Sequence, residues 1–537
     1  MVNQSKKITE KYFFLSIFII TIPFVTRLVI DFLLINRNDG FNLLSGDDVA
    51  RLAYSVRVAY LNDINFFYGL WPSFPIIVNG IAFKLTNEPV MTVQIINALT
   101  GILIMAAIYK SIPHTLGAKG LVIILLLIVA TEPVLLSLSS SGLADNFGIL
   151  FLALGFFFTV NNGKNKSHYN NLSAICYAAA SAVKLEYGFF CFAFVALGAY
   201  DLIKSGISKK LLLEFFIKSA LSTSYIIVFF GYNKYVMGDF MAFSKLFKNY
   251  YENSWIYADV STPYQRFIFF PVMLFNGFKG GLLLALPGLF LMQKNKENSS
   301  LVKSLIWLVV FPFILFSINA AQSVVPDNIG PGPRHVAPYI LFLLIPVAAT
   351  LHWLLSRTTC VKPIGLLIIL FICLAGIHEA FLISPQSSIE SRLLGKIISK
   401  AYEKNAILPN QKVIFEEGFS PASDKPSNLD ALTFYSYMPR SIYILNATNK
   451  ISGLFMTELN GSASARAGII KGDIALLILY NKKLISEIPE MDKIGSLGSY
   501  EIFAAKGNVR ACNFIAKSLF FGGPCKENKL RDTAVSE

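Results

Sequence analysis

Hydrophobic residues along this chain gather in long runs that short polar segments separate. A helix needs about 20 apolar residues to cross roughly 30 Å of hydrocarbon, and only helices can satisfy the backbone polar groups of such isolated runs in lipid. The pattern therefore predicts about eleven transmembrane helices, at approximately residues 12–35, 88–108, 120–138, 145–161, 171–184, 187–203, 212–235, 267–291, 303–319, 336–355 and 363–383.

The pattern changes after about residue 384, where the apolar segments become short and alternate with polar ones. They predict strands at Gln411–Glu416, Ser441–Leu445, Asp473–Tyr480 and Tyr500–Ala504 and helices at Ser387–Tyr402 and Asn428–Tyr437. We therefore expect a membrane all-α fold, a polytopic bundle over residues 1–384, followed by a small soluble α/β domain over residues 385–537.

Composition and charge agree with a membrane protein and give it an orientation. Hydrophobic residues make up 54% of the chain and charged ones 15%, whereas soluble proteins carry about 25% charged residues. With the N-terminus inside, the inner segments carry fifteen Lys and Arg residues against three acids, as the positive-inside rule requires. The net charge of +14 is thus explained without a nucleic acid partner. The C-terminal domain and the long loop 36–87 are expected outside.

Cysteine and histidine give few signals. No Cys or His spacing indicates a zinc site. Cys512 and Cys525 lie in the outer domain, where oxidising conditions would permit a disulfide, although two free thiols are an equal alternative.

The first outer loop carries the most informative polar residues. Ser45 and Asp48 have the spacing of a capping box, which predicts the start of a helix. In that helix Arg51 can approach both Asp47 and Asp48, at i,i+4 and i,i+3. Taken alone, these residues indicate a capped, salt-bridged surface helix.

Other polar residues lie at the outer ends of the predicted spans. Because ionisable groups at the edge of a bilayer bundle indicate function, we expect an outward-facing cavity, formed with the first loop by Trp71, Asp145, Lys184, Glu186, Arg334 and His335. Two plainer interpretations stay open. The cations could be interfacial anchors that fix helix depth, and Glu186 could simply pair with Lys184.

This ordered set resembles the GT-C superfamily of integral-membrane glycosyltransferases, which includes the protein O-mannosyltransferases and the aminoarabinose transferases that modify lipid A. The resemblance rests on Asp47-Asp48-x-x-Arg51, on Trp71-Pro72-x-x-Pro75, on Asp145 and on Lys184-x-Glu186, together with the helix count and the outer domain. The chain lacks the Trp-Trp-Asp motif of oligosaccharyltransferases, which argues against en bloc transfer to asparagine.

The resemblance implies an inverting enzyme that takes a sugar from a polyprenyl-phosphate-linked donor. Asp47 would be the general base, and Asp48 or Asp145 would orient Asp47 or the acceptor. Lys184 and Arg334, with Arg51 or His335 as further candidates, would contact the phosphate leaving group. No cofactor is certain, although the carboxylates could instead bind a divalent cation.

The acceptor is left open as a glycan, a lipid or a protein, and the expected location is the bacterial inner membrane. The main alternative is a lipid or polysaccharide flippase or transporter. That function favours charged residues at mid-membrane depth and repeated halves, and the spans look almost free of such charge. An O-antigen-ligase-like enzyme would place its catalytic loop late in the chain. A non-catalytic scaffold would not explain Asp47 and Asp48.

Overall fold

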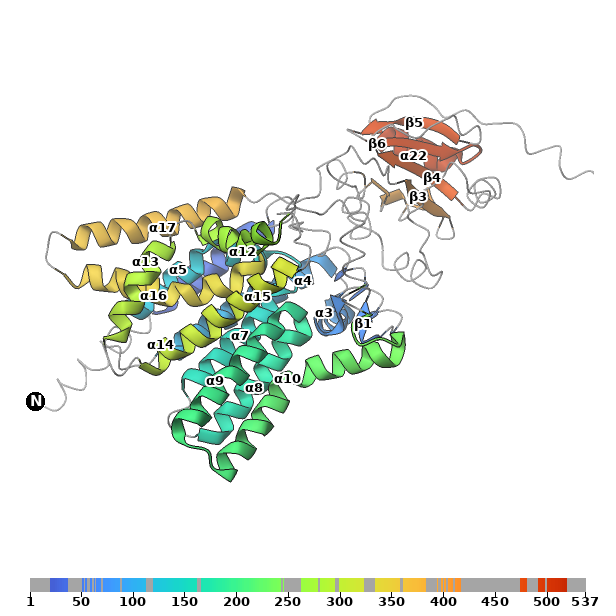
Figure 1. The fold of residues 1–537 in the computed structure, drawn as a ribbon. Helices are drawn as coiled ribbons and strands as arrows, with labels where there is room; N and C mark the ends of the chain where they lie inside the picture. The colour runs from blue at the N-terminus through green and yellow to red at the C-terminus, as the bar shows by residue number, and fades with distance from the viewer. Residues whose placement is uncertain are drawn as a thin grey trace, which may run out of the picture. The chain divides into compact units, whose positions relative to one another are not determined.

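The computed structural model divides the chain into two compact units (Figure 1). The first unit holds Met1–Leu44, Asn65–Pro75 and Met91–Ser384, and the second holds Ser45–Ile64, Ile76–Val90 and Pro385–Glu537. The structure describes single residues and short stretches within 51–68, 245 and 394–408, and the longer segments 20–36, 71–86, 89–112, 119–161, 166–242, 262–278, 281–294, 299–322, 334–357, 361–382, 411–416, 474–480, 491–497 and 500–518.

Helices build the first unit, and one lies in each of the eleven predicted apolar ranges. The first spans residues 20–36. The others are α4 (Pro89–Ser111), α5 (Lys119–Thr131), α6 (Pro133–Ser140), α7 (Asp145–Val160), α8 (Lys166–Val183), α9 (Gly188–Ser205), α10 (Lys209–Met237), α12 (Pro263–Phe278), α13 (Gly281–Gln293), α14 (Ser299–Leu305), α15 (Phe311–Gln322), α16 (Ala337–Leu355) and α17 (Lys362–Leu382). A π-helical turn, Ile306–Val310, joins α14 to α15.

The number of membrane spans is smaller by strict criteria than the predicted eleven. Among the described residues, six helices are long and apolar enough to cross a membrane, or up to eight if each of two bent pairs is one span. Helix α7 and residues 171–183 of α8 are apolar but shorter. The polytopic helical fold is thus confirmed, while the count of eleven is not.

One predicted continuous span, residues 120–138, is broken. Helices α5 and α6 meet at 57°, with Glu132 between them. Pro133 has no N–H to donate to the preceding turn, so the helix cannot continue unbroken. A new helix starts instead, and the Glu132 carboxylate caps it by accepting a hydrogen bond of 2.6 Å from the N–H of Leu135.

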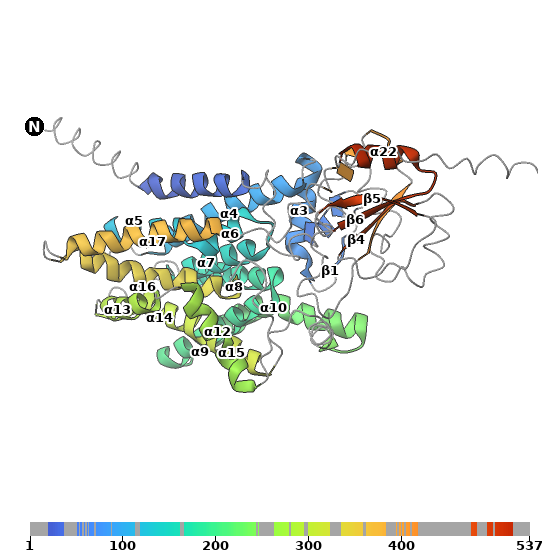
Figure 2. The same ribbon diagram turned by 90° about the horizontal axis from the view of Figure 1, so that it is seen from above.

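Small residues let the helices of the first unit approach closely. Helices α7 and α8 lie side by side (Figures 1 and 2). Gly155 of α7 faces the ring of Tyr177, while the hydroxyls of Thr159 and Ser173 lie 2.5 Å apart and both donate to the Gly155 carbonyl. Small residues and interhelical hydrogen bonds are the usual means of packing helices in lipid. They fix the relative position of α7 and α8, whose ends carry candidate site residues.

The second unit contains helical residues of the first outer loop. Residues 51–52, 54–55 and 58–59 are helical, which agrees with the predicted helix, and the Ser55 hydroxyl donates to the Arg51 carbonyl at 2.8 Å. Helix α3 (Ser73–Thr86), which begins in the first unit, was not expected inside this loop. Its Ile76 and Phe83 are fully buried.

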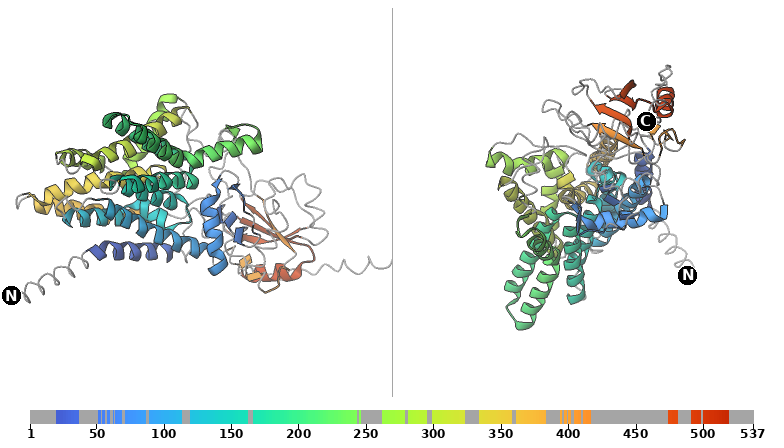
Figure 3. Two further views of the ribbon diagram at one scale, coloured as in Figure 1. Left: turned by 90° about the horizontal axis from the view of Figure 1, so that it is seen from below. Right: turned by 90° about the vertical axis from the view of Figure 1, so that its right-hand side faces the viewer.

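A four-stranded sheet forms the centre of the second unit, which confirms the α/β class (Figure 3). Its order is β3 (Lys412–Glu416), β4 (Ile474–Tyr480), β6 (Tyr500–Ala505), β5 (Met491–Leu497), with β3 and β4 parallel and the other pairs antiparallel. Three predicted strands are confirmed. Strand β5 was missed because its residues are mostly polar and partly exposed. The predicted strand Ser441–Leu445 and helix Asn428–Tyr437 lie outside the described residues.

Helix α22 (Val509–Ser518) packs against β5 and β6 through a buried face that includes Ile515 and Cys512. Cys512 is disulfide-bonded. Its predicted partner, Cys525, lies outside the described residues, so that pairing stays a prediction.

Candidate active site

Asp145 is the first residue of α7, and its carboxylate lies almost fully buried in the protein, 1% exposed. A helix N-terminus favours a negative charge because its free N–H groups carry partial positive charge. The Lys184 ammonium donates to Asp145 Oδ1 at 3.0 Å, and the Tyr187 hydroxyl donates to the same oxygen at 3.4 Å. Asp145 is therefore a carboxylate held by fixed partners.

Lys184 connects three segments that are far apart in the sequence. It lies between α8 and the 3₁₀ turn Leu185–Tyr187, and its backbone is extended. Its Nζ lies 3.0 Å from Asp145 Oδ1, 3.1 Å from Glu186 Oε2 and 3.2 Å from His335 Nδ1. An ammonium has three N–H groups, so Asp145 and Glu186 take two of them, and His335 takes the third when its Nδ1 carries no proton.

His335 enters from the 3₁₀ turn Arg334–Val336, which precedes α16. Its Nδ1 lies 3.2 Å from Lys184 Nζ and 3.2 Å from Glu186 Oε2. One nitrogen cannot accept from Lys184 and donate to Glu186 at the same time. Whether Nδ1 carries a proton therefore decides whether this ring accepts from the cation or donates to the carboxylate.

Packing around this cluster is aromatic and tight. An added Cβ on Gly148, one turn after Asp145, would lie 2.1 Å from the ring of Tyr187. The Phe190 ring stacks on Tyr339 at 5.4 Å between centroids, and Phe270 meets His335 edge-on at 6.3 Å. We call Asp145, Lys184, Glu186 and His335 the polar cluster. Its members come from the start of α7, the end of α8 and the start of α16, so they lie at one end of the bundle.

The predicted site residues divide into three groups. The structure brings four of them together as the polar cluster, with Arg334 adjacent in sequence. Arg51 is buried in the second unit, 6% exposed. Asp47, Asp48 and the side chain of Trp71 lie outside the described residues. The plain interpretation of Glu186, that it pairs with Lys184, describes its contact correctly.

No group of three or more His, Cys, Asp or Glu side chains in the described part of the chain has the arrangement of a metal site. In the polar cluster, Lys184 contacts both carboxylates and His335.

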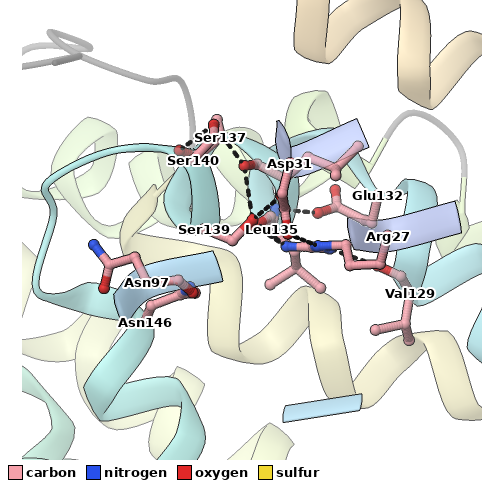
Figure 4. Close-up of polar contacts among 11 residues, drawn as sticks. Arg27, Asp31, Asn97, Val129, Glu132, Leu135, Ser137, Ser139, Ser140 and Asn146 are labelled. Atoms are coloured by element: carbon pink, nitrogen blue, oxygen red, sulfur yellow. Dashed lines mark hydrogen bonds and ion pairs between the residues drawn. The ribbon is translucent and has the colours of Figure 1, made fainter. Parts of the chain in front are cut away.

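Sequence reasoning missed a second polar group, a buried ion pair within the first predicted span. Arg27 and Asp31 lie in the first helix, 2% and 1% exposed, with their side chains 3.0 Å apart (Figure 4). The signal was present, because two opposite charges at i,i+4 inside an apolar run are costly unless they are paired. We call Arg27, Asp31 and Ser139, which contacts both, the Arg27 clamp.

Comparisons with known proteins connect this chain to solved structures only. No protein-family model and no curated protein matches the sequence. The apo structure of ArnT from Cupriavidus metallidurans matches 94% of this chain and 99% of that chain, with a TM-score of 0.57 at 12% sequence identity. The apo oligosaccharyltransferase of Archaeoglobus fulgidus matches 87% of this chain and 70% of that chain, with a TM-score of 0.49 at 12% identity. Over nearly its whole length, this chain therefore has the fold of ArnT.

Proposed function

We propose that this protein is a membrane glycosyltransferase that moves a sugar from a polyprenyl-phosphate-linked donor to an acceptor at the outer face of the membrane. The observation that carries the proposal is the polar cluster, which gathers at one end of a bundle with the ArnT fold. A lipid-linked donor keeps its tail in the bilayer and its phosphate at the interface. An enzyme for it needs acids and cations at the helix ends, and this bundle has them there.

The first chemical requirement is a base that removes the acceptor's hydroxyl proton while that oxygen attacks the anomeric carbon. We assign this role to Asp47 and expect Asp48 to orient it. Attack from the face opposite the phosphate inverts the anomeric centre. Asp145, whose oxygen is fixed by Lys184 and Tyr187, is then suited to position the acceptor hydroxyl or Asp47 rather than to move a proton itself.

The second requirement is positive charge for the departing phosphate. Because Lys184 already contacts both Asp145 and Glu186 and lies 3.2 Å from His335 Nδ1, a phosphate would have to compete with these partners. We therefore assign the main phosphate contact to Arg334, whose guanidinium can bind two phosphate oxygens at once. Lys184 holds the carboxylates in place and supplies long-range positive charge. Arg51 and Trp71 are proposed as further substrate contacts.

The transporter alternative has to be weighed against the buried charge of the first helix. However, the donors of Arg27 are bound to backbone carbonyls and to a neighbouring carboxylate. Such an arrangement is fixed within the protein and does not line a path for a moving substrate. We therefore keep the enzyme as the proposed function, in a bacterial inner membrane with a cytoplasmic N-terminus.

The donor can be tested by purifying the protein in mild detergent, extracting the bound lipids and analysing them by mass spectrometry. We expect a polyprenyl phosphate, with or without a sugar, to co-purify with the wild type and to be depleted in Arg334→Ala. Retention of that lipid by Lys218→Ala, which changes a cation of α10 outside the cluster, is the matched control. Binding of a nucleotide sugar in place of the lipid would contradict the proposal.

A further inference from the structure

The break between α5 and α6 leaves one backbone carbonyl of the first unit without its helical hydrogen-bond partner. In a continuous helix the carbonyl of Val129 would accept from the N–H of residue 133, but Pro133 has none. An unpaired backbone carbonyl away from water is costly. Arg27 Nη1 donates to that carbonyl at 3.1 Å. A side chain of the first helix therefore replaces the hydrogen bond that Pro133 cannot make.

The remaining contacts of Arg27 hold the second half of the broken span. Its Nη2 lies 2.6 Å from both the Leu135 carbonyl and the Ser139 Oγ, and its Nε donates to Asp31 at 3.0 Å. The Ser139 hydroxyl donates to the other oxygen of Asp31 (Figure 4). The Arg27 clamp therefore fixes α6 both at its first turn and near its last residue.

Helix α6 leads directly to the polar cluster. It ends at Ser140, and Asp145 begins α7 after a turn of four residues. Asn97 of α4 donates to the carbonyls of Ser141 and Leu143, at 2.7 and 2.9 Å, within that turn. On the far side, the Asn146 amide donates to the Asn97 carbonyl at 2.9 Å. The turn 141–144 is thus bound to α4 both by hydrogen bonds within the turn and by one from Asn146, just after it.

Close packing leaves α6 little freedom to move. An added Cβ on Gly101 of α4 would lie 3.0 Å from Ser139 Cβ and 3.3 Å from Arg27 Nη2. Helix α4 therefore lies directly against the Arg27 clamp, and the same helix carries Asn97. A shift of α6 would be passed to the turn 141–144 because both are bound to these neighbours.

We propose that the Arg27 clamp and Asn97 are positioning residues for Asp145. They hold α6 and the turn 141–144 so that the Asp145 carboxylate lies where Lys184 and the acceptor require it. A buried ion pair is weak evidence for a role in stability, because apolar residues of similar size often stabilise as well. The clamp instead fixes the orientation of α6, the second half of the broken span, which leads to Asp145. The catalytic consequence rests on the proposed function, whereas the placement of the turn does not.

The test combines hydrogen–deuterium exchange with enzyme kinetics on the full-length protein in membranes or detergent. The variants are Asp31→Asn, Arg27→Lys, Ser139→Ala and Asn97→Ala. The matched control is Glu214→Gln, which removes the i,i+4 partner of Lys218 on α10, where the nitrogen–oxygen distance is 3.5 Å and both side chains are partly exposed. Transfer is assayed with tritium-labelled undecaprenyl-phosphate hexoses and pentoses, and native membranes supply the acceptor.

The expected result has three parts. Backbone amides of residues 141–147 exchange faster in the four variants, while those of residues 189–197 in α9 do not change. Because a displacement of about 1 Å can cost about 10²-fold in rate, kcat falls by about 10- to 100-fold while the KM for the donor stays within about twofold. The loss caused by Asp31→Asn becomes much smaller in an Asp145→Asn background, since the two changes then act on one carboxylate.

Each other outcome overturns the inference at a definite step. Unchanged exchange at residues 141–147 in well-folded Asp31→Asn and Asn97→Ala would refute the positioning role, whatever the activity. Faster exchange with a normal kcat would refute the link from the turn to Asp145. If the loss of kcat caused by Asp31→Asn were fully additive with the loss caused by Asp145→Asn, the clamp would contribute only to general stability. Failure of the proposed function would be seen separately, as no transfer by the wild type with any lipid-linked donor, and the exchange result would still stand.

Discussion

Lys184 shows at the scale of one residue how its neighbours decide what a side chain can do. The sequence motif Lys184-x-Glu186 suggested a free cation for phosphate. In the structure its ammonium is bound by two carboxylates and by His335. Its charge is therefore balanced by these carboxylates where it lies, and its first effect is to hold Asp145 and Glu186 close together. The spacing within one segment could suggest that Lys184 pairs with Glu186. It could not show that His335, which is far away in the sequence, contacts both.

Asp145→Asn tests this cluster directly. The amide keeps the size of the side chain, but it removes the charge that Lys184 pairs with. We expect transfer to fall by about 10²-fold, because the residue that positions the reacting group is altered. The assay is the initial rate of sugar transfer in membranes at matched protein level.

Asp239→Asn is the matched control for this change. Asp239 also pairs with a lysine, Lys245, at 2.6 Å, but that pair is exposed. Surface pairs of this kind contribute about 0–1 kcal/mol, so the control should keep normal activity. If Asp145→Asn and Asp239→Asn were equally active, Asp145 would not be part of the active site.

At the scale of elements, hydrophobic runs predicted the helices well, because a span in lipid must be apolar and fully hydrogen-bonded. The same runs could not show where a helix breaks. Glu132-Pro133 marks the break between α5 and α6, yet a proline in a span often only bends it. Strand β5 and helix α22 were missed for a different reason, because both are short and their place depends on pairing with β6 and packing on the sheet.

The approach of α7 to the Tyr187 turn gives a prediction at this scale. Gly148→Ala would place a Cβ 2.1 Å from the Tyr187 ring, which must then move away from Asp145. Overpacking of this kind usually costs about 1–3 kcal/mol. We expect a lower midpoint of thermal unfolding in detergent together with a loss of transfer.

Gly231→Ala is the corresponding control in α10, where nothing lies within 4 Å of the added Cβ. It should leave both the unfolding midpoint and the activity unchanged or slightly improve stability, since alanine favours helix. A midpoint for Gly148→Ala equal to that of the control would contradict the close contact with Tyr187.

For the whole molecule, orientation follows from the distribution of cations among the loops. The inner segments predict an inside N-terminus and an outside C-terminus. Reporter fusions after residues 165, 298 and 537 should therefore read inside, inside and outside. An inside signal at residue 537 would place the C-terminal domain on the wrong side for an outer-face enzyme. It would contradict the predicted orientation.

The likeness to ArnT over the whole chain is visible at this scale although sequence identity is only 12%. A bundle of apolar helices tolerates wide substitution as long as its residues stay apolar, so sequence comparison finds no relative. The short polar motifs at the helix ends carried the resemblance instead. They pointed to this fold, but they could not reveal the Arg27 clamp, which depends on contacts between residues more than 100 positions apart.

The most direct test of the central claim is the transfer of a labelled sugar from a polyprenyl-phosphate donor by membranes that contain wild-type protein or Asp47→Asn. If Asp47 is the general base, the amide removes the proton acceptor, and transfer should fall by about 10²–10⁴-fold. Expression, thermal stability and binding of the donor lipid should be retained, because the phosphate contacts belong to other residues. Wild-type rates in Asp47→Asn, together with equal rates in Asp48→Asn, would contradict the account.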